Sequence, residues 1–226
     1  MNVEDPRISK SQLDKLGSRL RNDAEPTDED LVLLDRYREQ FIFVSDTIVG
    51  KLRQLTEFPI ESRHKSVPSI VAKLRRRQPA RLSAVQDLAG ARIIVPGLLA
   101  QDQLVQELTA LYPNSDVDDK RAKPRFNYRA VHVIIFNPLP YEVQIRTDLQ
   151  HVWAELSERL ADRYGFELKY GGGPADISSA LADYSDFAYA VDRFADFRQG
   201  QGEDLTGAVE VYLERLPSIM EVLKVR

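Results

Sequence analysis

In YEVQIRTDLQHVWAE, at residues 141–155, a strand pattern changes into a helix pattern. Apolar and polar side chains alternate over residues 141–146, which is typical of a strand with one buried face. Thr147 and Gln150 then match a capping box, a pattern that begins many helices, and Trp153 continues the helical spacing. The stretch therefore predicts a strand that runs directly into a helix.

Two segments upstream also have the character of strands. Residues 91–95, ARIIV, are short and rich in β-branched side chains, and residues 128–136 lead through the turn-forming link NPLP at 137–140 into the strand above. That arrangement predicts an antiparallel hairpin. Residues 102–111 have the spacing of an amphipathic helix. We expect an α/β (α+β) chain with a mixed, mostly antiparallel sheet flanked by helices.

Helical patterns extend to both ends of the sequence. Thr27 with Asp30 forms the capping-box start of a long helix. Downstream, the tract GGGP at 171–174 interrupts the chain, and the remainder predicts two acidic helices split near residues 200–202. We expect one compact domain that consists of an N-terminal helical segment (1–58), a core (59–170) and a C-terminal helical segment (171–226).

The composition limits both location and chemistry. No run approaches the ~20 apolar residues that span a bilayer, and the first residues lack the basic and apolar regions of a signal peptide. We therefore expect a soluble, cytoplasmic protein without membrane contact. The sequence has no cysteine and 3 histidines, which excludes disulfides and thiolate zinc sites and leaves little for a histidine cage. Any bound metal should be a hard ion held by oxygen ligands.

A basic segment lies upstream of the first predicted strand. Between Arg63 and Gln86 there are seven Lys or Arg residues and no Asp or Glu, although the whole chain has a formal net charge of -4. Pro68 fits the first turn of a short helix that starts at residue 66 or 67, and a helix N-terminus with nearby cations suits phosphate. A solvated helix face would give the same charge pattern. The segment is a candidate for an anion-binding surface.

Two acidic residues are candidates for a metal site. Asp87 precedes a turn into the strand at 91–95, and Glu142 lies on the polar face of the strand at 141–146. Asp before a glycine turn is often only a turn former, and a polar strand face is often only solvated. If the two carboxylates converge, they match the preference of Mg²⁺ for a few carboxylates plus substrate phosphates. The sequence lacks a Walker-type loop, so Arg and Lys side chains would have to hold those phosphates.

Four motifs resemble those of RelA/SpoT-type (p)ppGpp synthetases and occur in the same order. Four ordered matches are far more specific than any isolated motif. The motifs are RHKSVPSI with a following KL (63–74), DLAGARII (87–94), YRAVH (128–132) and EVQIRT with a following QHVWAE (142–155). The resemblance implies a nucleotidyltransferase-like synthetase fold in a single-domain small alarmone synthetase. It also implies a Mg²⁺-dependent GTP diphosphokinase that moves pyrophosphate from ATP to the ribose 3′-hydroxyl of GDP or GTP.

The resemblance also implies a role for each matching residue. The donor ATP would be bound at its phosphates by Arg63, Lys65, Ser69 and Lys73, and at adenine by Arg92. The catalytic residues and Mg²⁺ ligands would be Asp87 and Glu142, and Glu142 would also accept the proton of the attacking hydroxyl. The acceptor would be bound by Tyr128, which stacks on its base, and by His132, Gln144 and Arg146.

The identity of the acceptor stays open at this point. The family's usual glycine before the tyrosine is replaced by Asn127, which tolerates a left-handed backbone best among other residues, and residues 120–127 also depart from the family pattern. GDP or GTP is the leading acceptor. The alternatives are adenosine nucleotides or the 3′ end of tRNA, as in toxin-like relatives, and a catalytically silent nucleotide-binding regulator. An antitoxin, tRNA and a second copy of the chain stay open as partners.

Overall fold

The computed structural model describes residues 8–22, 25–76, 81–198 and 214 of the chain. Its elements, with η for a 3-10 helix, are α1 (Lys10–Asn22), α2 (Asp28–Leu55), β1 (Ile60–His64), α3 (Val67–Arg76), η1 (Leu82–Ala84), β2 (Ala89–Val95), α4 (Leu98–Leu111), β3 (Ser115–Asp119), β4 (Val131–Phe136), β5 (Pro140–Thr147), α5 (Asp148–Tyr164), η2 (Phe166–Tyr170) and α6 (Ala175–Arg198). The predicted combination of strands with flanking helices is confirmed.

The five strands form one mixed sheet in the order β1-β2-β5-β4-β3. β4 and β5 are neighbours joined by residues 137–139, so the predicted hairpin is confirmed. β1 and β3 lie at the two edges, and their sequences, IESRH and SDVDD, are mostly exposed and polar. Periodicity does not predict these two strands, because a strand that buries neither face needs no alternation of apolar and polar residues.

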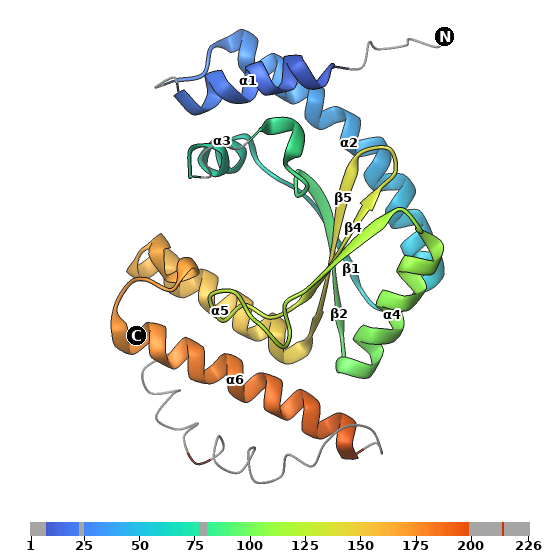
Figure 1. The fold of residues 1–226 in the computed structure, drawn as a ribbon, viewed down its shortest axis with the longest axis vertical. Helices are drawn as coiled ribbons and strands as arrows, with labels where there is room; N and C mark the ends of the chain where they lie inside the picture. The colour runs from blue at the N-terminus through green and yellow to red at the C-terminus, as the bar shows by residue number, and fades with distance from the viewer. Residues whose placement is uncertain (1–7, 23–24, 77–80, 199–213, 215–226) are drawn as a thin grey trace. The chain divides into compact units, whose positions relative to one another are not determined.

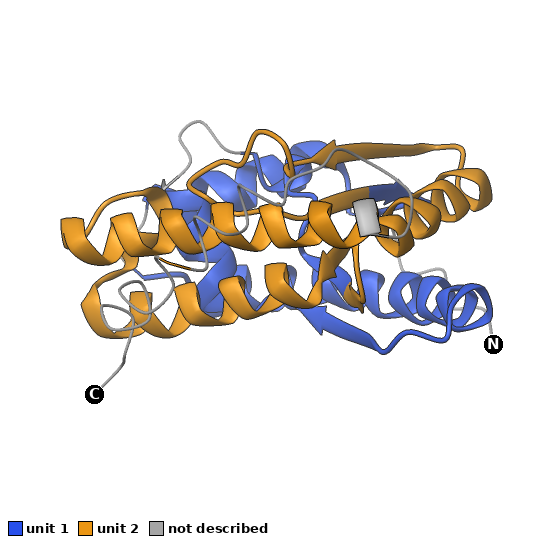
Figure 2. Ribbon diagram, turned by 90° about the horizontal axis from the view of Figure 1, so that it is seen from below, with its two compact units in different colours: residues 1–91, 134–143 blue, residues 92–133, 144–226 orange. Residues whose placement is uncertain are grey.

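Backbone contacts divide the chain into two compact units, of which unit 1 comprises residues 1–91 and 134–143 (Figure 2). In unit 1, α1 packs against α3 and η1, and α2 packs against β1 (Figure 1). Thr27 is the N-cap of α2 and accepts from the Asp30 amide at 3.2 Å, as the sequence predicts. The unit is held together by fully buried apolar side chains, among them Leu16, Leu20, Leu34, Phe41, Ile48, Leu52, Ile70 and Leu74.

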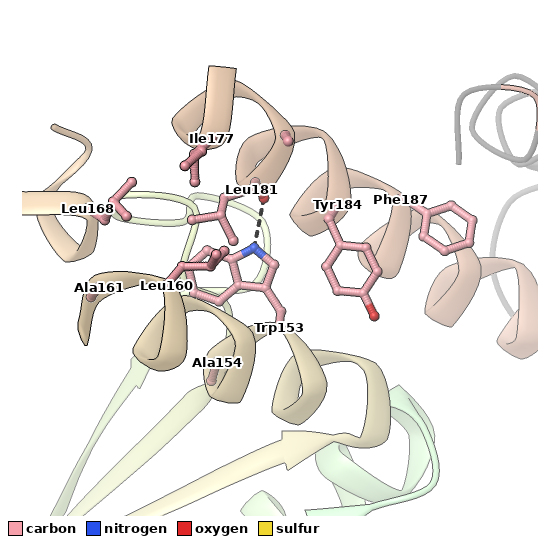
Figure 3. Close-up of a cluster of buried hydrophobic side chains, with 10 residues drawn as sticks. Trp153, Ala154, Leu160, Ala161, Leu168, Ile177, Leu181, Tyr184 and Phe187 are labelled. Atoms are coloured by element: carbon pink, nitrogen blue, oxygen red, sulfur yellow. Dashed lines mark hydrogen bonds between the residues drawn. The ribbon is translucent and has the colours of Figure 1, made fainter. Parts of the chain in front are cut away.

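Unit 2 comprises residues 92–133 and 144–226, and its long helices α5 and α6 lie side by side (Figures 1 and 2). α5 begins with the predicted capping box between Thr147 and Gln150, in which each side chain accepts from the other's amide at 3.2 Å. Trp153 of α5 donates from Nε1 to the Leu181 carbonyl oxygen of α6 at 2.7 Å, within a buried apolar cluster (Figure 3). Leu181 and Phe187 of α6 are buried members of this cluster. A homo-oligomer stays a prediction.

The predicted start of β4 is wrong. β4 begins at Val131 rather than residue 128, because Phe126 and Asn127 both have positive φ, 54° and 64°, in a turn closed by the bridge between Arg125 and Tyr128. Tyr128 therefore lies just outside the strand. The left-handed backbone predicted for Asn127 is confirmed.

Two other elements begin a few residues earlier than predicted, β2 at Ala89 and α4 at Leu98. Gly97 caps α4 without a side-chain hydrogen bond, so the sequence carries no capping signal there. The second helix predicted after residue 200 lies outside the described residues, and the segment boundaries at 58 and 170 stay predictions. Within the part of the chain that the structure describes, no helix combines the length and apolar character needed to cross a membrane.

Candidate functional site

Two lysines and one aspartate of unit 1 form an ionic cluster, called the Lys-Asp-Lys triad below. Lys65 follows β1, Lys73 lies in α3 and Asp87 precedes β2. Lys65 Nζ lies 2.8 Å from Asp87 Oδ2, and Lys73 Nζ lies 2.5 Å from Asp87 Oδ1. Each of the three side chains is 19–20% exposed. The structure thus brings together three of the residues that the sequence assigns to the phosphates and the metal.

The triad keeps its carboxylate ionised. Burial raises the pKa of the Asp87 carboxyl, but the charge of Lys73 and the hydrogen bond and charge of Lys65 outweigh burial and lower that pKa from 3.8 to about 2. Two ammonium groups against one carboxylate leave the triad net positive. Because the triad is partly exposed, it attracts anions, and ammonium groups form strong charge-assisted bonds with phosphate oxygens.

The other two predicted phosphate ligands are exposed residues near the triad in sequence. Arg63 lies in β1, and Ser69 lies in the first turn of α3, where its hydroxyl accepts from the Ser66 hydroxyl at 2.9 Å. The sequence of that first turn, VPSI, contains no Asp or Glu to offset the positive end of the helix dipole. A helix start of this kind beside Lys65 suits a phosphate group.

Glu142 lies on β5 next to the glycine of the DLAG motif. A Cβ atom on Gly90 would lie 2.4 Å from the Glu142 carbonyl oxygen, so only glycine lets the β2 backbone approach β5 this closely. Asp87, which opens the same motif, and Glu142 therefore belong to neighbouring segments of unit 1. Among the described residues, no group of three or more His, Cys, Asp or Glu could hold a metal ion. A metal here would depend on two carboxylates, which suits Mg²⁺ when phosphate oxygens complete its shell.

Four polar residues of unit 2 form a hydrogen-bonded group, called the Tyr128 cluster below. The Tyr128 hydroxyl lies 2.8 Å from His132 Nε2, and Arg146 Nη2 donates to the same hydroxyl oxygen at 3.0 Å. Arg146 Nη2 also donates to Gln144 Oε1 at 3.2 Å, and the guanidinium lies 5.2 Å from the centre of the Tyr128 ring. All four residues that the sequence assigns to the acceptor thus lie in one cluster.

The cluster fixes the position of the Tyr128 ring. His132, Gln144 and Arg146 are only 5–8% exposed, whereas Tyr128 is half-buried and packs near Trp153 with 6.3 Å between the ring centres. Buried polar groups that bond to one another keep one arrangement, because breaking a bond leaves a buried donor or acceptor unsatisfied. Tyr128 therefore presents its ring from a rigid support.

Arg92 of β2 forms an ion pair that sequence reasoning missed. Its Nη1 lies 3.3 Å from Glu155 Oε1 of α5. Glu155 is the last residue of the QHVWAE segment of the fourth motif, so its place in that motif was the one available signal. The pair orients the planar guanidinium of Arg92, and the face of such a group can stack on an aromatic ring.

The Lys-Asp-Lys triad and the Tyr128 cluster both lie within the region that matches a known protein family. The family model described as "Region found in RelA / SpoT proteins" matches residues 62–165, which include the whole triad and the whole Tyr128 cluster. Uncharacterized proteins of Mycobacterium tuberculosis and Mycobacterium bovis are 34% identical to the chain in an alignment of 187 positions, which covers 78% of this chain and 67% of theirs. The chain belongs to the RelA/SpoT family.

Solved structures of small alarmone synthetases share the fold of this RelA/SpoT chain. The small alarmone synthetase 1 of Bacillus subtilis, bound to its product pppGpp, has a TM-score of 0.62 and 23% identity, with 74% of this chain and 97% of that chain covered. A GTP pyrophosphokinase family protein from Streptococcus pneumoniae has a TM-score of 0.57 and 21% identity, with 83% and 98% covered. The alarmone-synthetase-like fold predicted from the motifs is confirmed.

Proposed function

We propose that this RelA/SpoT chain is a Mg²⁺-dependent GTP diphosphokinase, which transfers pyrophosphate from ATP to the ribose 3′-hydroxyl of GDP or GTP and yields (p)ppGpp and AMP. The observation that carries the proposal is that the family region contains two differently built polar groups, the charged triad and the hydrogen-bonded Tyr128 cluster. The triad has the chemistry of a polyphosphate-binding site, and the Tyr128 cluster has that of a surface on which a nucleotide base stacks.

The ATP phosphates are the proposed ligands of Lys65 and Lys73. Both ammonium groups already lie on one carboxylate, at 2.8 and 2.5 Å, so they can bind adjacent phosphate oxygens with small movements. Arg63 and Ser69 complete the proposed set. Arg92, oriented by its ion pair, is proposed to stack on adenine.

Asp87 and Glu142 are the proposed Mg²⁺ ligands. Their chemistry fits the ion, because Asp87 with a pKa of about 2 is ionised at neutral pH and Glu142 is a half-buried carboxylate on the neighbouring strand. When bound, the ion would supply charge neutralisation at the phosphate oxygens. Lys65 and Lys73 would then bind phosphate in place of Asp87.

The acceptor base is the proposed ligand of Tyr128. Stacking on an aromatic ring contributes about 1–3 kcal/mol for any base, so the ring alone does not choose between purines. The proposed discrimination rests on hydrogen-bonding groups beside the ring, of which His132 and Gln144 belong to the cluster. Adenosine nucleotides and the tRNA 3′ end must therefore be compared directly with guanosine nucleotides.

The proposed reaction is a displacement at the β-phosphorus of ATP. The 3′-oxygen of the acceptor forms a bond to that phosphorus, the bond to the oxygen that bridges to the α-phosphate breaks, and AMP leaves with that oxygen. The proton of the hydroxyl passes to the Glu142 carboxylate. Lys65 and Lys73 offset negative charge on the transferred group, so catalysis rests on positioning and charge neutralisation.

Incubation of the purified chain with γ-labelled ATP, Mg²⁺ and one acceptor at a time tests this proposal. The acceptors are GDP, GTP, ADP, ATP and deacylated tRNA, and we expect label on GDP and GTP that disappears when EDTA removes Mg²⁺. Label only on adenosine nucleotides or only on tRNA would replace the guanosine acceptor. Transfer to none of them would contradict the proposed enzyme and favour a silent nucleotide-binding regulator.

A further inference from the structure

One serine of α6 holds both neighbours of Tyr128. The Ser185 hydroxyl donates to the Asn127 carbonyl oxygen at 2.6 Å and accepts from Arg129 Nε at 3.0 Å. Asn127 and Arg129 directly precede and follow Tyr128 in the sequence. The buried Ser185 side chain therefore ties the backbone on one side of Tyr128 and the side chain on the other.

Arg129 adds further contacts to α6. Its guanidinium donates to Asp186 Oδ1 at 2.5 Å and to the Arg121 carbonyl oxygen, and it lies 4.5 Å from the centre of the Tyr189 ring. Arg129 is buried, with 7% of its surface exposed. A buried guanidinium is costly unless its donors are bonded, so the segment that carries Arg129 is strongly held in place.

Two other positions on the same face of α6 anchor residues near the Tyr128 cluster. The Leu181 carbonyl oxygen accepts from Trp153 at 2.7 Å, and Asp192 Oδ2 accepts from the Thr147 hydroxyl at 2.7 Å. At about 100° per residue, these two positions and Ser185 fall within about 40° of one another around the helix. α6 thus presents one stripe of anchors to the segments that carry the cluster.

The turn before Tyr128 needs such anchors. Phe126 and Asn127 have φ values of 54° and 64°, a left-handed backbone that side chains other than glycine adopt at a cost. Surrounding contacts must hold a backbone of this kind. The bond from Ser185 to the Asn127 carbonyl oxygen is a contact of that sort, so its loss should let the turn relax and the Tyr128 ring shift.

We propose that Ser185, acting with Arg129, is a positioning residue for the acceptor: it holds residues 126–130 in the geometry that presents Tyr128 to the acceptor base. α6 begins at Ala175, downstream of the matched family region that ends at residue 165, so a helix outside that region sets acceptor affinity. The inference rests on the proposed function for the identity of the ligand. Whether α6 holds the turn before Tyr128 can be measured without knowing that ligand.

Steady-state kinetics of Ser185→Ala test the positioning role. The change removes two hydrogen bonds, so we expect the KM for the acceptor to rise about fivefold to tenfold while the KM for ATP changes by less than about twofold. Ser179→Ala, at an exposed position of the same helix, is the matched control and should leave both constants unchanged. Ser185→Thr keeps the hydroxyl and should restore most of the acceptor affinity. Equal rises in both KM values, or no rise, would overturn the inference.

Hydrogen exchange separates this inference from the proposed function. In Ser185→Ala, amides at residues 126–130 should exchange faster than in Ser179→Ala, while amides of α5 should keep their rates. Unchanged exchange at 126–130 would overturn the positioning role whatever the chain catalyses. If the unaltered chain transfers nothing, GDP binding followed by the fluorescence of Trp153, the only tryptophan of the sequence, replaces the kinetics. Equal GDP affinity in Ser185→Ala and Ser179→Ala would then refute the inference.

Discussion

The Lys-Asp-Lys triad and the Tyr128 cluster hold their polar side chains in different ways. The triad depends on opposite charges at 2.8 and 2.5 Å and keeps each side chain about one-fifth exposed. The Tyr128 cluster depends on hydrogen bonds through shared atoms, and three of its four members are 5–8% exposed. Partly exposed ion pairs exchange partners readily, because water and other ions compete for them, whereas a buried hydrogen-bonded network keeps one arrangement.

This difference matches two separate tasks in the proposed reaction. Phosphates and Mg²⁺ must bind and leave in every cycle, so the residues that hold them should accept replacement partners. A base is selected by the shape and fixed polar groups of its site, so the residues around it should not move. Substitutions in the triad and in the cluster should therefore affect different kinetic constants.

Glu142→Gln changes a proposed Mg²⁺ ligand and should have the largest effect of these substitutions. Glutamine keeps the shape of the side chain but cannot accept the proton or ligate Mg²⁺ as an anion, so we expect turnover to fall by about a hundredfold or more. The thermal unfolding midpoint should stay close to that of the unaltered chain. Glu158→Gln, at an exposed position of α5, is the matched control. Turnover near that of the unaltered chain would remove Glu142 from its proposed role.

Lys73→Met should affect ATP and not the acceptor. One charge-assisted contact is worth ~1.5–3 kcal/mol, so the KM for ATP should rise about tenfold or more. The pKa of Asp87 should rise as well, since the charge of Lys73 does most to lower it. Lys15→Met in α1 is exposed and serves as the control. An equal rise in the KM for the acceptor would break the separation between the two groups.

Substitutions of Tyr128 separate its ring from its hydroxyl. Tyr128→Ala removes the stacking surface and should raise the KM for the acceptor about tenfold, with a smaller change for ATP. Tyr128→Phe keeps the ring but loses the bonds to His132 and Arg146, so its effect should be intermediate. Steady-state kinetics with each substrate varied in turn measure both. If Phe and Ala reduced acceptor binding equally, the hydroxyl and not the ring would carry the interaction.

Asp192→Asn should have the smallest effect, and the effect should appear in stability. Burial, together with Asp196 and Asp148, raises the pKa of Asp192 to about 6, although the Thr147 hydrogen bond lowers it. The folded chain thus binds this proton more tightly than the unfolded chain, where the pKa is about 3.9, so stability should fall as the pH rises from about 4 to about 6. Asparagine does not titrate, so Asp192→Asn should remove this contribution to the pH dependence of stability.

Urea unfolding at several pH values measures this effect. Over that pH window the unaltered chain should lose roughly 1–2 kcal/mol of unfolding free energy relative to Asp192→Asn. Asp87 titrates lower and with the opposite sign: its depressed pKa adds stability above about 3.9 that is lost as the pH falls toward 2. Parallel pH profiles for the two chains would show that Asp192 does not titrate in this window.

Local patterns predicted those parts of the fold that local physics determines. Thr147 and Gln150 form the complete capping box, and Thr27 accepts from the Asp30 amide, because the partners lie within one helical turn in each case. The left-handed backbone at Asn127 follows from the tolerance of its side chain. β1 and β3 escaped prediction because edge strands carry no apolar alternation, and Tyr128 was placed in a strand because the turn at Phe126 has no glycine.

The candidate site could be predicted from the motifs only as a set of residues. The sequence named Lys65, Lys73 and Asp87, but nothing in their spacing says that both lysines pair with the same carboxylate. The anchor at Ser185 was missed for the same reason, since its partner Asn127 lies 58 positions away and no local pattern links them. Contacts of this kind depend on how segments distant in the sequence pack, and periodicity gives no information about that packing.

The fate of each ATP phosphate distinguishes pyrophosphate transfer from other reactions of ATP. Two parallel incubations with GDP, one with α-labelled and one with γ-labelled ATP, are analysed for nucleotide products. We expect α-label in AMP and γ-label in the guanosine product, in equal molar amounts, because the β- and γ-phosphates move together. Label from the γ-phosphate in free orthophosphate, with the α-label in ADP, would contradict pyrophosphate transfer.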